Sequence, residues 1–138
     1  MKLKIFNKEN AVSNTRLSTK PLVRINGGNG AFTFNKAAIQ QLKLTNANAI
    51  EFVLNEEEND WYVAVDKKGD KGFKLREDKD RHLNLIAQSS VMARTILNSM
   101  GGSVARCSLP IGSLIKHEGM DMYLLVTAGA LNVTVYEE

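Results

Sequence analysis

The residues best placed to do chemistry in this chain are basic side chains near an aromatic one. Lys74 and Arg76 flank Leu75, so the two bases should project from one face of a strand whose other face is core. Tyr62 alternates with Trp61 and should face outward from the strand at 61–65. A sheet surface that combines bases with an exposed ring is typical of single-stranded nucleic-acid binding. The same bases are also typical of an edge strand that charge protects against pairing.

Positive charge is concentrated in the first third of the sequence. Residues 1–45 carry eight Lys and Arg against one acid, a net of +7, and residues 46–138 carry ten bases against fourteen acids, a net of −4. The two add to the +3 of the whole chain. A basic region of this size attracts polyanions, although uneven charge on a solvated surface is the simpler alternative.

Motifs of the common catalytic classes are absent from the sequence. No GxSxG, HExxH, CxxC or phosphate-binding Gly-Lys-Ser/Thr occurs, and the glycine-rich run at 27–30 precedes a strand instead of a helix. His82 and His117 stand apart, and Cys107 has apolar neighbours, as expected of a buried and inert thiol. We therefore expect a non-enzyme without a cofactor. A carboxylate pair assembled by the fold stays open.

The acidic run at 55–60, Asn-Glu-Glu-Glu-Asn-Asp, is the one stretch with the composition of a cation site. Three consecutive glutamates point in different directions and lack the alternating ligand spacing of a calcium loop. A solvated hairpin turn is the better interpretation, and we expect no metal.

Compartment and membrane contacts follow from apolar runs and cysteine content. No apolar run approaches the ~20 residues that a membrane span needs, and residues 1–11 lack the apolar stretch of a secretory signal. The single cysteine excludes an internal disulfide and fits a reducing compartment. The sequence predicts a cytoplasmic protein with no membrane partner.

Hydrophobic periodicity predicts an α+β fold. We expect a twisted, mostly antiparallel sheet of about eight strands with two helices, the longer helix packed on the sheet. Asn35 should cap a helix over 36–44, and Ser89 or Ser90 a helix over 91–100. Residues 1–20 should form an N-terminal strand followed by a loop or mobile arm, and residues 21–138 a single domain.

The second half of the sequence predicts two further features. Pro110-Ile111-Gly112 should end the strand that starts at 103, with a turn or helical fragment over 114–118. The runs at 122–127 and 131–135 should then form a terminal hairpin around Ala128-Gly129-Ala130.

Residues 22–54 resemble the DNA-binding half-barrels of the AbrB/MazE type. A hydrophobic strand leads to Phe34-Asn35-Lys36-Ala37, a short helix closed by Leu42-Lys43-Leu44, and a strand over 50–54. The chain departs from the family pattern where Asn35 replaces a proline, Lys43 a glycine, and Thr45-Asn46-Ala47-Asn48 a Gly-Asp turn. The resemblance implies a dimer whose first strand and loop face DNA, with Arg24 and Lys36 as phosphate or base contacts.

Together these observations predict a small, non-enzymatic nucleic-acid-binding protein that forms a homodimer. The candidate contacts are four bases for phosphates and one ring for stacking: Arg24, Lys36, Lys74, Arg76 and Tyr62. The alternative is a structural or protein–protein assembly module in which the lysines only keep the chain soluble. An enzyme with an acidic site is the third class.

Overall fold

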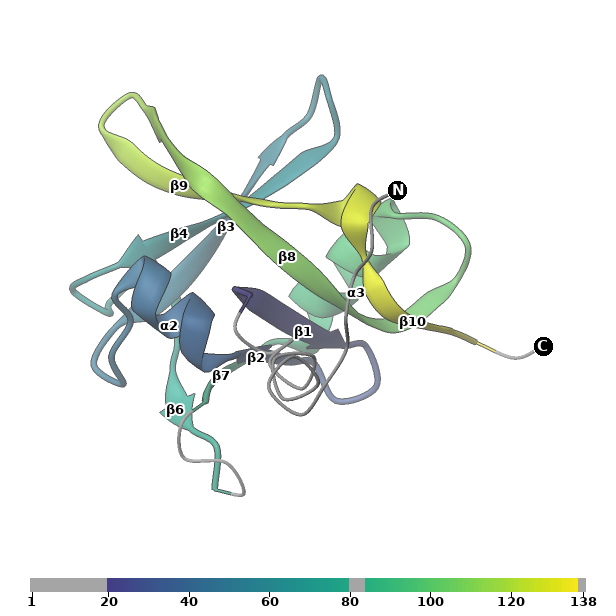
Figure 1. Ribbon diagram of the computed structural model, residues 1–138, viewed down its shortest axis with the longest axis horizontal. Coiled ribbons are helices and arrows are strands. Elements are labelled where there is room, and N and C mark those ends of the chain that lie inside the picture. The colour runs from purple at the N-terminus through teal and green to yellow at the C-terminus, as the bar shows by residue number, and fades with distance from the viewer. Residues whose placement is uncertain (1–19, 80–83, 137–138) are drawn as a thin grey trace, which may run out of the picture.

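Ten strands and two helices make up the described part of the chain, residues 20–79 and 84–136, in this computed structural model (Figure 1). The first half contains β1 (Leu22–Asn26), β2 (Ala31–Phe34), α2 (Lys36–Leu42), β3 (Ala49–Asn55) and β4 (Asp60–Asp66). The second contains β5 (Phe73–Lys74), β6 (Arg76–Glu77), β7 (Leu85–Gln88), α3 (Ser90–Ser99), β8 (Val104–His117) and β9 (Met120–Leu125). A 3-10 turn, η2 (Thr127–Gly129), and β10 (Leu131–Val135) complete it. Residues 1–19, which hold nearly all of the predicted N-terminal strand and arm, and His82 lie outside the described residues.

The sheet is a nearly closed barrel. Its strand order is β5-β3-β4-β9-β8-β1-β2-β7-β6, with β10 attached to β8, and every described pair is antiparallel. The two end strands, β5 and β6, are consecutive in sequence and separated only by Leu75. The chain therefore crosses from one end of the sheet to the other in a single residue, which brings the two ends together.

The predicted α+β class, the antiparallel sheet and the two helices are confirmed. The strand number is ten, not about eight, mainly because the stretch after residue 72 divides into β5, β6 and β7. Leu75 is buried between exposed Lys74 and Arg76, so the predicted alternation is right. The prediction of one strand carrying both bases is wrong, because β5 pairs with β3 and β6 pairs with β7.

The barrel consists of two topologically equivalent halves. The order strand, strand, helix, strand, strand occurs as β1-β2-α2-β3-β4 and again as β5/β6-β7-α3-β8-β9. The halves exchange strands, since β1 pairs with β8 and β5 pairs with β3, while β2 meets β7 and β4 meets β9. Among the described strands, β10 is the one without a described counterpart in the first half.

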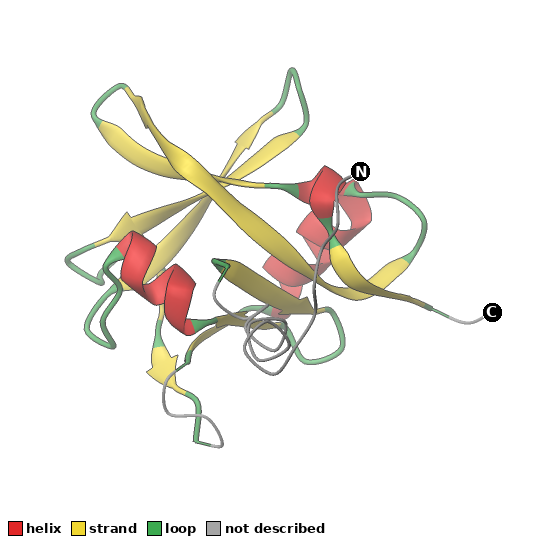
Figure 2. Cartoon of the chain, in the orientation of Figure 1, coloured by secondary structure: helices red, strands yellow, loops and turns green. Residues whose placement is uncertain are grey.

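Both helices begin where the sequence predicts. The Asn35 side chain accepts a hydrogen bond from the Ala38 N–H at 2.9 Å, and Ser89 Oγ accepts one from the Met92 N–H at 3.1 Å. The longer helix, α3, buries Ala93, Ile96 and Leu97 and contacts β8, β1 and β2, which confirms its predicted packing on the sheet. Figure 2 shows α2 and α3 on different sides of the central strands.

Aromatic and branched side chains fill the barrel. The largest fully buried residues include Phe32, Phe34, Ile25, Ile50 and Leu109. The rings of Phe32 and Phe52 lie 4.7 Å apart between centroids, so β2 and β3 meet across the core. Trp61 is 5% exposed, as its strand alternation predicts.

Pro110 does not end its strand, contrary to prediction. β8 continues from Val104 to His117, and its tight turn is Glu118-Gly119, whose φ angles are 50° and 81°. The Pro110 carbonyl accepts a hydrogen bond from the Val126 N–H at 2.9 Å, so its ring nitrogen faces the same side, toward η2. Because no strand lies there to require a donor, the proline is tolerated.

The predicted terminal hairpin is also wrong. β9 and β10 do not pair with each other, and instead pair with successive parts of β8. The turn at 127–129 is the 3-10 turn η2, which carries the chain onward along β8 without reversing it. β10 is consequently an added strand beside β8.

No helix in the described residues has the length and apolar character of a membrane span.

Candidate nucleic-acid interface

Strand register places two of the predicted basic residues on one face of the sheet. Arg24 on β1 lies opposite Thr33 on β2, Thr33 lies opposite Ile86 on β7, and Ile86 lies opposite Arg76 on β6. Directly opposed residues of antiparallel strands project from the same face. Arg24 and Arg76 therefore share the outer face of the barrel, three strand spacings or about 14 Å apart.

A third arginine joins this face from β8. Arg106 lies opposite Asn26 of β1, and its neighbour along the face, Ser108, lies opposite Arg24. The Arg106 Nε–H donates to Thr134 Oγ1 of β10 at 3.3 Å. We call the outward surface that carries Arg24, Arg76 and Arg106 the basic face.

The basic face contains a cavity of about 310 Å³ where β10 lies along β8. Two guanidinium groups, two amides and two hydroxyls contribute to its lining, which consists of Arg24, Asn26, Arg106, Cys107, Ser108, Asn132 and Thr134. None of the described residues of that lining carries a carboxylate. Guanidinium N–H groups fit planar or tetrahedral oxyanions through paired hydrogen bonds, and the amides and hydroxyls add neutral donors. The cavity thus has the chemistry of an anion site.

The positive charge of the basic face is not neutralised by described neighbours. Within residues 20–79 and 84–136 the single ion pair joins His117 and Glu118, at 3.9 Å between Nε2 and Oε1, on the β8–β9 turn. Arg24, Arg76 and Arg106 pair with no carboxylate of that part of the chain. An incoming anion would therefore meet charge for which no carboxylate of the described residues competes.

The two predicted lysines flank the basic face. Lys74 is exposed on β5, opposite Ala49, and follows Arg76 around the barrel wall. Lys36 is the exposed first residue of α2. The Asn35 side chain accepts from the Leu22 N–H at 3.1 Å and donates to the Lys20 carbonyl at 2.7 Å, which fixes the start of α2 beside the start of β1.

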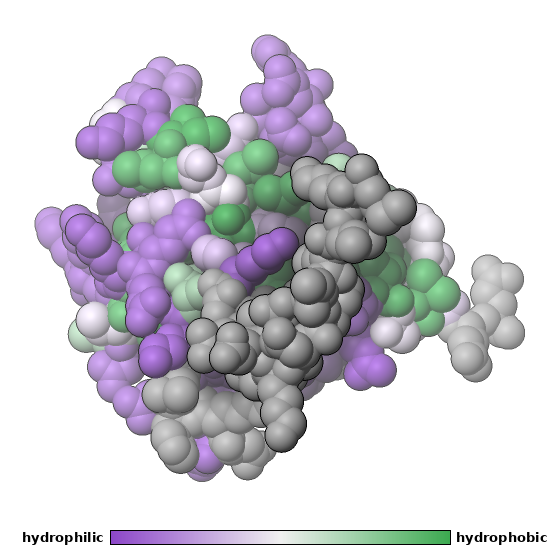
Figure 3. All heavy atoms as spheres, viewed as in Figure 1, coloured by the Kyte–Doolittle hydropathy of each residue, from purple (hydrophilic) through white to green (hydrophobic). Residues whose placement is uncertain are grey.

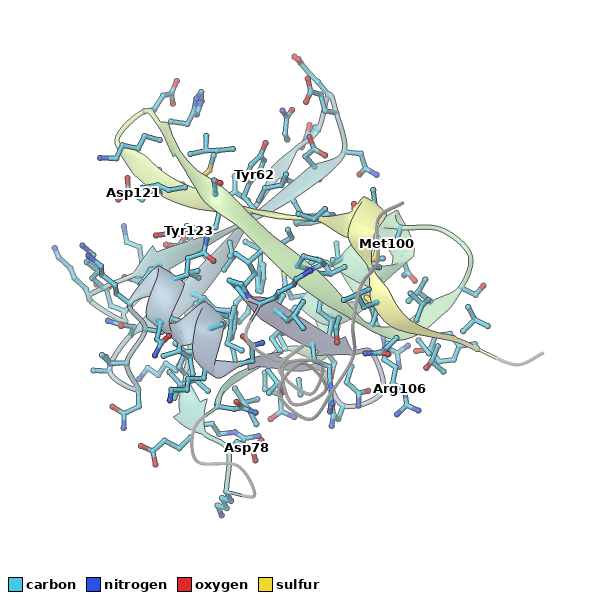
Figure 4. All side chains as sticks on the ribbon, in the orientation of Figure 1. Tyr62, Asp78, Met100, Arg106, Asp121 and Tyr123 are labelled. Carbon is cyan, nitrogen blue, oxygen red and sulfur yellow. The ribbon has the colours of Figure 1, made fainter. Side chains whose placement is uncertain are left out.

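Tyr62 does not lie beside these bases. It is half-buried on β4 opposite Val53 and Leu124, and β9 and β8 separate β4 from β1. Figure 4 shows Tyr62 in the upper middle of the view and Arg106 at the lower right. The prediction that Tyr62's strand adjoins the strand of Lys74 and Arg76 is wrong, because β3 lies between β4 and β5. The residues described do not form a single platform of bases and ring.

Arg106 is the functional candidate that sequence reasoning missed. Alternation along 103–111 places Arg106 and Ser108 on the polar face of their strand, but it assigns them no neighbours. Their position beside Arg24 depends on the β1–β8 register, which joins residues more than eighty positions apart. Cys107 points into the core and is 2% exposed, and its burial raises the pKa of the thiol, as expected of an inert cysteine.

The acidic run at 55–60 is a hairpin turn between β3 and β4, as predicted. Among the described residues no group of three His, Cys, Asp or Glu side chains is arranged to hold a metal ion.

A larger cavity of about 600 Å³ lies between the end of α2 and the β8–β9 hairpin. Its lining carries charges of both signs, including Lys43, Lys67, Glu118 and Asp121. Mixed charge gives it no preference for a polyanion, so the basic face is the stronger candidate.

Comparison with known proteins adds no relative. No family model matches the chain, and no curated protein or solved structure matches it either. The protein is therefore described from its own structure, as an α+β barrel with exchanged strands and an outer cavity lined by arginines.

Proposed function

We propose that this protein binds nucleic acid by holding backbone phosphates on its basic face. The observation that carries the proposal is the cavity between Arg24 and Arg106, whose described lining has two guanidinium groups and no carboxylate. Phosphate oxygens are the natural partners of such a pair, because charge-assisted hydrogen bonds to guanidinium are short and paired.

The extent of the basic face favours a polymer over a single small anion. Arg24 and Arg76 stand about 14 Å apart, which corresponds to roughly four phosphates of one strand at about 3.4 Å each along a duplex axis. Lys74 extends the face beyond Arg76, and Lys36 stands beside the start of β1. Contacts to phosphates position a nucleic acid and carry no sequence information directly. The proposal is therefore for backbone binding.

The resemblance noted in the sequence concerns the stretch that forms the first elements of the barrel. A strand pair, a short helix and a further strand follow one another as β1, β2, α2 and β3, with Arg24 on the first strand and Lys36 at the start of the helix. This order supports a DNA-binding role for the same two residues. The proposed function involves no catalytic step and no cofactor.

Fluorescence anisotropy with labelled single-stranded and duplex DNA tests the proposal. For a protein that neutralises about five phosphates, affinity should fall by about two orders of magnitude or more between ~50 and ~200 mM salt. Arg24→Glu and Arg106→Glu should each weaken binding strongly. The matched control is Arg94→Glu, because Arg94 is an exposed arginine on α3 and not on the basic face.

Either of two results would reject the proposal. One is the absence of binding at the lower salt concentration. The other is an equal loss in the Arg94→Glu variant, which would mean that affinity follows net charge and not the basic face. A preference for one strand state would show whether the face accepts a single strand or a duplex.

A further inference from the structure

Ser108 is a nearly buried polar side chain in the Arg24–Arg106 cavity. It is 8% exposed, yet its hydroxyl makes no hydrogen bond with the described part of the chain. Among the described residues, no fully enclosed side-chain nitrogen or oxygen of a buried residue lacks a partner, so the Ser108 hydroxyl must open into the cavity that it lines. A buried polar group without a protein partner requires water or a ligand. The cavity wall therefore holds a hydrogen-bonding group that a ligand can use.

Asn132 reaches the same cavity through an irregularity in β10. Leu131 lies opposite Ser108 and Thr134 lies opposite Arg106, so three steps along β10 match two along β8. The extra residue makes a β-bulge, and Asn132 within it has a φ of 51°, in the left-handed region that residues other than glycine rarely adopt. Bulges occur beside functional sites, where they redirect a side chain. Apolar residues flank this asparagine in the sequence, and Figure 3 shows hydrophobic surface at the right of the view, where β10 lies.

The amide of Asn132 has both of its hydrogen-bonding atoms available. The other amide of the cavity, Asn26, accepts from the Gly28 N–H at 2.8 Å through its Oδ1, which holds it in a turn. Thr134 Oγ1 likewise accepts from Arg106. The Asn132 side chain makes no hydrogen bond with the described residues. A free donor beside a free acceptor matches the edge of a base that offers the complementary pair.

We propose that this cavity receives one unpaired nucleotide of a bound single strand and favours adenine. This selectivity rests on the proposed nucleic-acid function, because the arginines must hold the backbone phosphate. A phosphate contact alone needs no cavity, whereas about 310 Å³ lies at the lower end of the range for ligand pockets, roughly 300–1,000 Å³. Asn132 Oδ1 accepts from the 6-amino group of adenine and Nδ2 donates to the adjacent ring nitrogen, the usual pairing of asparagine with this base.

Guanine is the alternative, because it is the base that arginine reads best and the cavity has two arginines. Under the proposed function those guanidinium groups hold the phosphate, and their planes can stack on the base. The Arg106 Nε–H already donates to Thr134 Oγ1 at 3.3 Å. Asn132 is therefore the residue left to read the edge of the base.

Fluorescence anisotropy with short thymidine oligomers that differ only in one central base tests the selectivity. A central adenine should give about fivefold or more tighter binding than cytosine, guanine or thymine, as expected of one paired asparagine contact. Asn132→Gly should abolish this preference and leave the salt slope unchanged, because it removes the amide and not the arginines. Glycine adopts a φ of 51° freely, so the bulge survives the substitution.

Asn59→Gly is the matched control variant. Asn59 also has a left-handed backbone, with a φ of 56°, and it is exposed on the turn between β3 and β4, off the basic face. The same chemical change at the same backbone conformation should leave the adenine preference intact.

A central purine without the 6-amino group is the matched change in the ligand. It keeps the phosphate and the stacking surface of adenine, but it leaves Asn132 Oδ1 without its donor. The wild-type chain should bind this oligomer no more tightly than the all-thymidine one. That comparison does not depend on how a variant folds.

The outcomes separate this selectivity from the proposed function. Equal, salt-sensitive binding of every oligomer would overturn the selectivity and leave backbone binding intact. A preference for another base would also overturn it, as would an adenine preference that survives Asn132→Gly or loss of the 6-amino group. Absence of binding to any oligomer at low salt would reject the proposed function, and the selectivity with it.

Discussion

Lys74 and Arg76 are two residues apart in the sequence, yet they belong to strands at opposite ends of the sheet. Lys74 ends β5, which pairs with β3, and Arg76 begins β6, which pairs with β7. Leu75 between them is buried, and its N–H donates to the Asn48 carbonyl at 3.3 Å. This one residue is the covalent connection across the barrel's remaining gap, so its side chain should matter for stability far more than its neighbours' do.

Replacing Leu75 with alanine should destabilise the protein by about 2–5 kcal/mol, because truncation leaves a cavity where the two sheet ends meet. Urea unfolding followed by circular dichroism measures the change. Leu114→Ala is the control, since Leu114 is 44% exposed and should cost about 1 kcal/mol. Equal losses in the two variants would mean that Leu75 is not a closing residue.

A buried indole links the sheet to the longer helix. Trp61 Nε1–H on β4 donates to Ser99 Oγ at 2.8 Å, and Ser99 Oγ–H donates to the Ile96 carbonyl at 2.6 Å. Ser99→Ala should cost about 1–3 kcal/mol, because it leaves a nearly buried donor without its acceptor. Fluorescence of Trp61, the single tryptophan, reports the unfolding directly.

Thr95→Ala is the matched control for that experiment. Thr95 is exposed on the same helix, and its hydroxyl donates only to the Val91 carbonyl one turn earlier. Its removal should change stability by less than about 0.5 kcal/mol. A loss as large as that of Ser99→Ala would contradict the role given to the indole hydrogen bond.

Local signals in the sequence predicted those features of the fold that residues close together in the sequence determine. Asn35 and Ser89 begin helices because capping is a contact over three residues, and Trp61 is buried because alternation is a property of one strand. The prediction that Pro110 ends its strand was wrong, because a proline is tolerated or not according to what lies beside it across the sheet. Its missing N–H faces η2, and nothing near it in sequence indicates that.

In the candidate site, too, local features were predictable and long-range contacts were not. Exposure of Arg24, Lys36, Lys74 and Arg76 followed from alternation and from a helix start, and the structure has all four exposed. Which of them meet depends on long-range register. Arg106 joined Arg24 through the β1–β8 pairing, and Tyr62 was separated from the bases by the insertion of β3, so neither outcome was readable from spacing.

Asp66 should make stability depend on acid pH. Backbone N–H groups of Lys71 at 2.8 Å and Gly72 at 2.9 Å donate to its Oδ2, and they hold its pKa below the ordinary value of 3.8. A carboxylate with a depressed folded pKa stabilises the fold above its unfolded pKa, and loses that contribution as pH falls through the folded pKa. The loop that these bonds close leads directly into β5.

We therefore expect wild type to be more stable than Asp66→Asn near neutral pH, with the difference shrinking below about pH 4. Urea unfolding at a series of pH values measures both. Asp70→Asn is the control, because Asp70 lies in the same loop and is exposed, with no hydrogen bond to other described residues. A difference independent of pH would show that the loop does not require the charged form of Asp66.

The nucleic-acid proposal specifies which residues contact the polymer, and not only that the protein is basic. Arg24 lines the cavity that Arg106 also lines, so Arg24→Ala should reduce the slope of log affinity against log salt by about one. Stacking on Tyr62, which the sequence predicts, is the alternative arrangement that the same experiment tests. Since that ring lies on β4, away from the basic face, we expect Tyr62→Ala to leave affinity for single-stranded DNA unchanged.

Anisotropy titrations of the two variants at several salt concentrations distinguish the arrangements. A stacked base is worth about 1–3 kcal/mol, so a ring that contacts the strand would cost roughly fivefold or more in affinity when removed. Such a loss, with an unchanged salt slope in Arg24→Ala, would move the interface from the β1–β8 surface to the β4 side of the barrel. The opposite pattern would place the phosphates between Arg24 and Arg106, because only a group in direct contact with the polymer changes the number of ions released.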